Sequence, residues 1–406
     1  MPGWHGATLQ LETEGKIRTV GIIQEQHPDR ARLFMQWKGM DWPIFVDALD
    51  LLEVAVVPIT VFVDEHGIVR QVSPRPADLA GFVARDFAPA AASEDTANRL
   101  GLADLAALAV AVEARVPSGL EGRPDAEQAA AWKAHAQTLF LWGGADELDT
   151  AIEAFEKAVD LEPADGQARF QLGVAVRRRY DSPRRRAGDF QRAVDQWSRA
   201  LGLDPNQYIW RRRIQQYGPR LAKPYPFYDW VERARAEIRT RGETPVELVA
   251  EPGAAEIASP AKSFENAKGL EEPDPGGRIL RDERGFVSVE KTVVPGTVVA
   301  GGPARLHLVF RPNASIKAHW NNEAEDLEVW LEAPPGWEVD RPLIRVPNPP
   351  QPVSRETRIV EVEVRSPDSA TGSVTLSAYA LYYVCEDVKG TCLYRRQDIA
   401  VAVAVE

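Results

Sequence analysis

The sequence predicts a multidomain chain in which an α/β unit, a helical unit and a β-sandwich follow one another. Three observations support this fold class. Short apolar strands alternate with helical spacing over residues 1–87, small and aromatic residues recur at helical spacing over 125–240, and alternating apolar and polar residues fill 286–406. A length of 406 residues exceeds what one hydrophobic core normally organises, so two to three domains are expected.

Composition narrows the possible functions. With 44% hydrophobic and 27% charged residues the balance is that of a globular protein, and the net charge of −12 disfavours nucleic acid as a partner. No apolar run reaches the roughly 18 residues of a membrane span. The first residues lack the basic and apolar regions of a secretory signal, which leaves localisation open.

Motifs for metals, phosphates or nucleophilic catalysis are not found. The six histidines are scattered without ligand spacing, so no metal site is predicted. No Gly-rich phosphate loop, nucleophile elbow or HExxH motif is present, and no cofactor is predicted.

The first predicted domain, residues 1–87, begins with a helix over 4–15 and a βα unit over 17–40. A second apolar stretch over 42–47 follows. Residues 56–70 then predict a strand, a tight turn at Glu65-His66-Gly67 and an antiparallel return strand. This order of elements resembles the redoxin branch of the thioredoxin-like superfamily.

That resemblance implies a role for Val57 and Pro58. In this family a cis proline precedes the hairpin, packs against the active-site dithiol and leaves backbone groups free for an extended substrate, so Val57-Pro58 is the candidate substrate-binding segment. A trans proline that opens an edge strand is the alternative.

The family's catalytic motif is missing from the same region. No cysteine precedes Cys385, so the chain has no Cys-x-x-Cys at a helix N-terminus. The family's central first strand is also absent, which would leave two apolar edges unpaired. Two interpretations stay open: Met1 is an internal start of a longer protein, or the domain is a degenerate scaffold.

Residues 88–124 read as a connector with one short helix from Leu100 to Val116. The helical segment that follows contains a repeat in which small and aromatic residues recur with an offset of 42. Ala151, Phe155, Ala158, Leu161 and Pro163 match Ala193, Trp197, Ala200, Leu203 and Pro205.

This pattern resembles tetratricopeptide repeats, which use small residues where helices cross and leave a concave groove for a protein partner. The resemblance implies protein binding by Trp132, Trp210 and Tyr217. A plain helical spacer is the alternative. Three arginine triplets, at 177–179, 184–186 and 211–213, form a local basic cluster, but no aromatic platform for nucleic acid accompanies them.

Residues 241–285 are rich in Pro, Gly, Glu and Asp without periodicity and are expected to form a flexible linker or an irregular surface strap. From 286 onward, alternation predicts a β-sandwich of immunoglobulin-like type. The expected strands are 287–291, 304–310, 327–332, 358–364 and 372–385.

The two cysteines, Cys385 and Cys392, are the most informative residues. They flank a short loop between two predicted strands, so hairpin pairing would bring the thiols within bonding distance as a structural staple or a redox pair. Lys389 and Arg395-Arg396 are expected to favour the thiolate. The nearby Tyr382, Tyr383 and Tyr394 are expected to shield the pair.

Pro334-Pro335-Gly336-Trp337-Glu338 and the cysteine pair make this domain similar to the N-terminal domain of the thiol:disulfide interchange protein DsbD. That family's cysteine pair relays electrons to periplasmic client proteins, which implies an extracytoplasmic location and a thiol protein client. Two functions remain: a component of thiol–disulfide exchange, or a non-catalytic scaffold that uses the repeat groove. Without the Cys-x-x-Cys, enzyme status stays open.

Overall fold

The computed structural model describes residues 2–55, 57–88, 117, 119–219, 230–248, 264, 270–386 and 390–406, and it contains both helices and sheets, as the sequence predicts. The chain divides into two compact units. The first contains Met1–Arg178, Ala200–Arg211 and Trp230–Val249. The second contains Arg179–Arg199, Arg212–Asp229 and Ala250–Glu406. The helix expected over Leu100 to Val116 lies outside the described residues.

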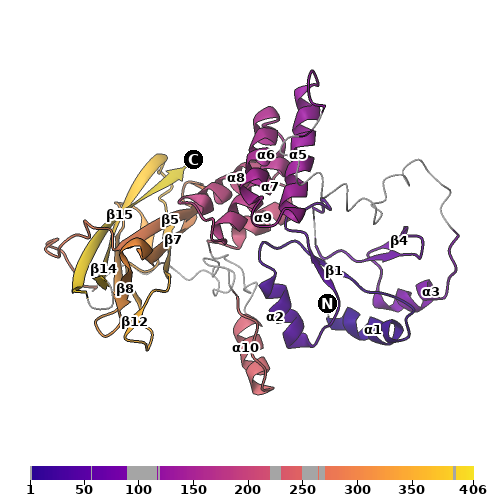
Figure 1. Cartoon of the computed structure of the whole chain (residues 1–406), viewed down its shortest axis with the longest axis horizontal. Coiled ribbons are helices and arrows are strands. Elements are labelled where there is room, and N and C mark those ends of the chain that lie inside the picture. Colours follow the sequence, from indigo (N-terminus) through magenta and orange to yellow (C-terminus); the bar gives the residue numbers. More distant parts are fainter. Residues whose placement is uncertain are drawn as a thin grey trace. The chain divides into compact units, whose positions relative to one another are not determined.

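The first unit opens with short strands and helices (Figure 1). Its α/β elements are α1 (Pro2–Thr13), β1 (Gly21–Ile23), α2 (Asp29–Lys38), β2 (Ile44–Val46), β3 (Val61–Val63), β4 (Val69–Val72), the 3-10 turn η1 (Pro76–Asp78) and α3 (Leu79–Val83). Strand β1 pairs in parallel with β2, and β3 pairs antiparallel with β4 in a separate two-stranded sheet.

Local chemistry explains the turn of the β3–β4 hairpin. The Asp64 carboxylate accepts hydrogen bonds from the backbone N–H groups of His66 and Ile68, each at 2.9 Å. Gly67 adopts a φ of 81°, a conformation that glycine tolerates without steric cost. The turn therefore falls at Glu65-His66-Gly67, where the sequence predicts it.

The predicted helical segment is helical in the structure. Its helices are α5 (Asp125–Trp142), α6 (Leu148–Leu161), α7 (Gly166–Tyr180), α8 (Asp189–Leu203), α9 (Tyr208–Gln215) and α10 (Trp230–Thr240). Helix α5 packs against α6. The recurring small and aromatic positions are buried on the apolar faces of α6 and α8: Ala151, Phe155, Ala158, Ala193, Trp197 and Ala200.

The second unit contains two β-sheets around one apolar core. The strands are β5 (Val287–Val294), β6 (Thr297–Val298), β7 (Pro303–Pro312), β8 (Ala318–Asn321), β9 (Leu327–Glu332), β10 (Glu338–Val339), β11 (Leu343–Val346), β12 (Val353–Ser354), β13 (Arg358–Arg365), β14 (Gly372–Glu386) and β15 (Cys392–Val405), with a 3-10 turn η4 (Ala314–Ile316). One sheet has the order β10-β13-β7-β5. The other has the order β11-β9-β14-β15-β6, and β8 joins it by pairing with β12 and β14.

The β14–β15 hairpin positions the cysteines. Its register runs from Gly372 opposite Val405 to Cys385 opposite Cys392, without a shift. Side chains alternate along both strands, so Val384 and Val401 enter the core between the sheets while their neighbours face outward. The two cysteines thus lie at the end of the long hairpin, as the alternating pattern predicts.

Residues 270–285 form an irregular strap along the edge and outer face of this hairpin. The backbone of Arg281 forms a parallel bridge with Arg396 of β15. The Asp282 carboxylate accepts hydrogen bonds from the backbone N–H groups of Phe286 and Val287 and so shapes the turn that leads into β5.

Candidate functional site

Cys385 and Cys392 form a disulfide that closes the open end of the β14–β15 hairpin. Their Cα atoms lie 4.0 Å apart, a short separation typical of antiparallel pairs that do not exchange backbone hydrogen bonds. The sequence prediction that the two sulfurs face each other across the strand ends is confirmed.

The two sulfur-bearing residues differ in their access to solvent. Cys385 is 2% exposed, whereas Cys392 is exposed. On the side away from Cys392, Cys385 pairs in register with His319 of β8, which is also buried. Of the two residues, Cys392 is therefore the one that solvent reaches.

The disulfide lies on the outward face of its sheet. Val384 and Trp320 are fully buried members of the core, and alternation directs the adjacent Cys385 and His319 to the opposite face. The sequence offered no signal for the partnership with His319, because η4 and β8 are far from β14 along the chain.

Two stacked tyrosines adjoin the disulfide on this face. The rings of Tyr383 and Tyr394 lie 4.4 Å apart and are inclined by 23°. Burial and a hydrogen bond to Glu325 raise the pKa of Tyr383, and burial with nearby acidic groups raises the pKa of Tyr394 to about 12. Both phenols are therefore neutral at physiological pH, and they form the next cross-strand pair on the same face as the disulfide.

Tyr382 does not shield the disulfide, contrary to the sequence expectation. It is 1% exposed and points into the core, where its ring meets Trp320 edge to face at 5.8 Å. Its hydroxyl lies 2.8 Å from Asp282 Oδ2. The expectation was wrong because a residue next to Tyr383 on a strand faces the opposite side of the sheet.

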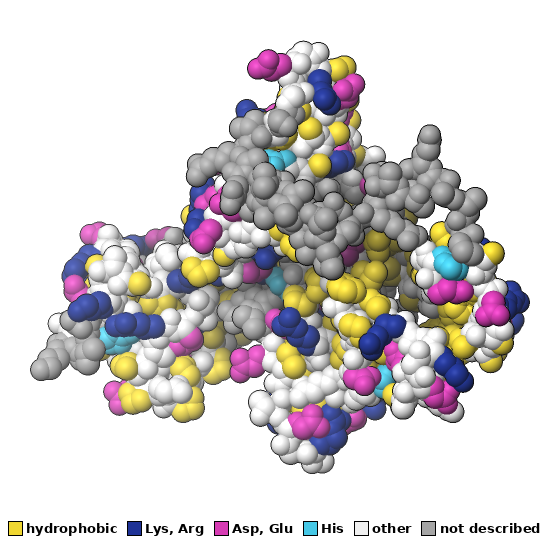
Figure 2. All heavy atoms as spheres, turned by 45° about the vertical axis from the view of Figure 1, so that its right-hand side comes forward, with side chains coloured by type: hydrophobic (Ala, Val, Ile, Leu, Met, Phe, Trp, Pro, Cys, Tyr) yellow, Lys and Arg dark blue, Asp and Glu magenta, His cyan; other side chains and the backbone are white. Residues whose placement is uncertain are grey.

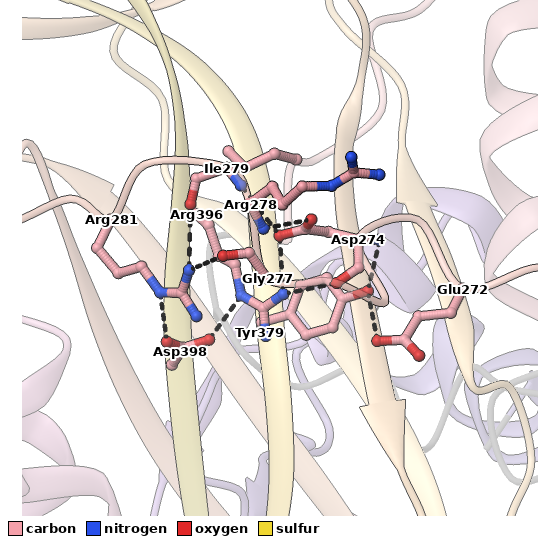
Figure 3. Close-up of polar contacts among 9 residues, drawn as sticks. All are labelled: Glu272, Asp274, Gly277, Arg278, Ile279, Arg281, Tyr379, Arg396 and Asp398. Carbon is pink, nitrogen blue, oxygen red and sulfur yellow. Dashed lines mark hydrogen bonds and ion pairs between the residues drawn. The ribbon is translucent and has the colours of Figure 1, made fainter.

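The strap meets the outer face of the hairpin in a polar network (Figure 3). The Asp274 carboxylate accepts hydrogen bonds from Arg396 Nη1 at 2.8 Å and from the backbone N–H of Arg278 at 2.9 Å. The guanidinium of Arg396 also contacts Asp398 at 2.7 Å and lies 3.7 Å from the ring centroid of Tyr379.

The pKa values of the residues in this network reflect their ion pairs and hydrogen bonds. Burial opposes ionisation of Asp274, but hydrogen bonds from Arg396 and two backbone N–H groups lower the pKa of that carboxyl. Burial also raises the pKa of Tyr379 to about 12. The Tyr379 hydroxyl accepts from the backbone N–H of Asp274 and contacts Glu272 at 3.2 Å. The charges of Asp274, Arg396 and Asp398 are thus paired with one another, so these residues hold the strap against the hairpin.

This pairing bears on two of the three basic residues that were expected to activate the thiols, Arg395 and Arg396. The charge of Arg396 is shared with Asp274 and Asp398. Arg395 lies on the other face of the strand from the disulfide and donates to the Tyr394 carbonyl. Lys389 lies outside the described residues.

The candidate substrate-binding segment lies in the first unit. The Val57–Pro58 peptide bond is cis, and Val57 is 43% exposed. The segment immediately precedes β3. Its role in substrate binding stays a prediction, because no cysteine of this chain lies in the first unit.

The aromatic residues expected to bind a partner mostly pack internally. Trp210 is 5% exposed and stacks on Phe170, and Tyr217 is fully buried and stacks on Trp197. Only Trp132 of the three keeps intermediate exposure. The helical spacing of these residues is compatible with a position in a groove or in a core. In the structure, Trp210 and Tyr217 lie in the core.

The arginine triplets also contribute to internal contacts. Arg177 and Arg213 are buried, and Arg179 forms a buried ion pair with Asp189. Arg178 donates to the Phe140 carbonyl. Three of the nine arginines, Arg177, Arg179 and Arg213, therefore lie inside the helical packing, whereas Arg184, Arg185 and Arg186 are exposed.

Across the described parts of the chain, no group of three or more His, Cys, Asp or Glu side chains is arranged to hold a metal ion. A search of the same residues for a helix of sufficient length and apolar character to cross a membrane finds none.

Comparisons with known proteins identify no family. No protein-family model matches the chain, and no curated protein matches it. Among solved structures, one similarity is to the alkylpurine DNA glycosylase AlkC of Pseudomonas fluorescens bound to DNA containing an abasic site analog. The sequence identity is 13%, the match covers 69% of this chain and 79% of the glycosylase, and the TM-score is 0.16. So low a score carries no argument about fold or function.

Proposed function

We propose that this chain takes part in thiol–disulfide exchange through Cys385 and Cys392. The observation that carries the proposal is the disulfide at the hairpin end, in which Cys392 is exposed and Cys385 is buried. Strained or exposed disulfides are the ones that exchange, whereas buried structural ones resist reduction.

The exchange proceeds in two displacements. A client thiolate attacks Sγ of Cys392, a new sulfur–sulfur bond forms, and Cys385 Sγ leaves with the electron pair of the broken bond. A second client thiolate then attacks the client sulfur of this mixed disulfide and releases Cys392. Two electrons pass from the donating dithiol to this chain, and its two protons end on Cys385 and Cys392. In the reverse direction the Cys392 thiolate attacks the disulfide of a second protein and expels one of its sulfurs as a thiolate; Cys385 then attacks Sγ of Cys392 and releases the other, so the electrons pass on.

Finer fold assignments form part of the same proposal. The parallel β1–β2 pair joined through α2 and the cis Val57–Pro58 bond before a hairpin support a redoxin-like domain that lacks its dithiol. Paired helices α5 and α6 support tetratricopeptide-like repeats. The two-sheet sandwich with its hairpin disulfide supports the DsbD-like, immunoglobulin-like domain and an extracytoplasmic site of action on a thiol protein client.

A glutathione titration tests the proposal. Oxidised protein is equilibrated in mixtures of reduced and oxidised glutathione. Free thiols are then blocked with a maleimide, and the masses of the products are measured by mass spectrometry. We expect reversible opening at a potential above about −300 mV, and loss of the glutathione adduct in Cys392→Ala. A potential well below that value identifies a structural staple. Because the chain lacks a Cys-x-x-Cys, we do not expect it to run a complete dithiol reductase cycle by itself, and insulin reduction at a thioredoxin-like rate would contradict that expectation.

A non-catalytic scaffold is the second candidate, and one observation favours it. Two valine pairs of the β3–β4 hairpin, Val61 with Val72 and Val63 with Val69, are between 44% and 63% exposed. Figure 2 shows hydrophobic side chains at the surface beside basic and acidic ones. Exposed apolar faces often mark protein contacts. If the disulfide does not exchange with glutathione, the scaffold function is the one that the result supports.

A further inference from the structure

Among the residues that the structure describes, the backbone edge of β15 beside the exposed cysteine has no partner strand. At Arg396 this edge is occupied: its N–H donates to the Leu280 carbonyl, and its carbonyl accepts from the Asp282 N–H, each at 2.9 Å. The backbone groups of Arg396 therefore point away from β14. Because strand geometry repeats every two residues, those of Tyr394 and Cys392 point to the same edge.

The side-chain geometry of the hairpin agrees with this orientation. Residues whose backbone groups point away from the partner strand form the close, non-hydrogen-bonded pairs of an antiparallel ladder. The 4.0 Å Cα separation of Cys385 and Cys392 and the tight stacking of Tyr383 on Tyr394 fit such pairs.

The strap stops short of this part of the edge. It turns onto the outer face at Asp274, so its pairing with β15 begins at Leu280. Within the part of the chain that the structure describes, the outward N–H of Tyr394 has no backbone partner, and the Tyr394 carbonyl accepts a side-chain hydrogen bond from Arg395. Open strand edges are templates for an added strand.

We propose that a protein client docks here by adding an extended, cysteine-bearing segment to the edge of β15 at Cys392 and Tyr394. Backbone hydrogen bonds to Tyr394 would hold the segment while its thiolate attacks Sγ of Cys392 and Cys385 Sγ leaves as described above. The inference rests on the proposed exchange function and deepens it, because it specifies an extended protein segment rather than a small thiol as the preferred reductant.

The continuity of the edge supports this occupant. The strap already pairs with β15 one step along the same edge, which demonstrates that the backbone there is regular enough to accept a strand. The exposed sulfur belongs to the strand whose edge is open, so docking and attack need no rearrangement of the hairpin.

The test uses the full oxidised chain and three thiols. They are the pentapeptide acetyl-Thr-Val-Cys-Val-Thr-amide, the same peptide N-methylated at both valines, and reduced glutathione. Rates of mixed-disulfide formation are measured by acid quench and mass spectrometry and corrected for the pKa of each thiol. We expect the parent peptide to react about tenfold faster than the other two, as roughly two backbone hydrogen bonds would give.

Matched variants test the same edge from the protein side. Tyr394→Pro removes the outward N–H without breaking a hydrogen bond to β14, whereas Tyr394→Val removes the ring but keeps the N–H. We expect the advantage of the parent peptide to vanish in Tyr394→Pro and to survive in Tyr394→Val, with glutathione rates equal in both.

The outcomes distinguish a failure of the docking inference from a failure of the exchange function. Equal rates for the parent and N-methylated peptides on the unchanged protein overturn the docking inference, even if Tyr394→Pro does not fold. A disulfide that no thiol opens, glutathione included, removes the exchange function itself and this inference with it.

Discussion

Reduction of the disulfide should lower the stability of the hairpin by a modest, calculable amount. The bond joins residues with a sequence separation of 7, so the closed loop contains 7 + 1 = 8 residues. Loop-closure entropy for a ring of this size predicts a loss of about 2.5 kcal/mol on reduction. By the thermodynamic cycle that links folding to reduction, the same energy lowers the reduction potential in the folded chain by about 50 mV relative to the unfolded chain.

Hydrogen exchange measures this loss where it occurs. Backbone amides of β14 and β15 in the core exchange through opening of the second unit, so their protection reports its local free energy. Oxidised protein, reduced protein and Cys392→Ala are compared by mass spectrometry of peptides from both strands. Peptides from α5 and α6 in the first unit serve as the internal control.

A change of about 2 to 3 kcal/mol is what loop closure alone gives, and it would show that the second unit stays folded in both redox states. Loss of the β14–β15 fold on reduction, or a loss above about 5 kcal/mol, would refute the reasoning, because the bond would then be a structural requirement that loop entropy does not explain.

Two further predictions concern buried charges of the second unit. Burial alone would raise the pKa of Glu361, but a hydrogen bond from His307 and nearby positive charge lower it to about 2, so the carboxylate stabilises the fold above about pH 4.5 and this contribution is lost as pH falls toward 2. Glu361→Gln should flatten that acid-induced loss in urea unfolding curves; an unchanged pH profile would contradict the assignment. Arg396→Leu leaves the Asp274 carboxylate buried without its ion pair and should loosen the strap by about 3 kcal/mol, measured as faster exchange of strap amides. Arg284→Leu removes an exposed pair with Glu386 as the control and should cost at most about 1 kcal/mol; equal effects of the two variants would exclude a clamp at Arg396.

Much of the candidate site could be predicted because it depends on local pattern. The alternation from Gly372 to Cys385 and from Ile399 to Val403 has the period of a strand, and a short loop joins the two runs. A hairpin of uniform register then brings Cys385 opposite Cys392. The cis bond at Pro58, by contrast, was implied only by the resemblance to the redoxin family, and local pattern alone also allowed a trans bond.

Other features were beyond sequence reasoning because they depend on contacts between distant segments. Asp274 meets Tyr379 and Arg396 across more than a hundred residues, in a stretch whose composition suggested a linker or a strap. Helical spacing identified Trp210 and Tyr217 as important, but it does not distinguish a groove from a core.

The amino-acid sequence by itself determined the mixed α and β architecture, the long hairpin and the meeting of the two cysteines, because strand period and turn composition act over a few neighbouring residues. The tertiary structure alone decided that Cys392 is exposed, that Cys385 lies beside His319 and that no described residue pairs with the edge of β15 at Tyr394. Exposure and edge pairing depend on which remote segments pack against a strand. The alternation of side chains along that strand does not specify those segments.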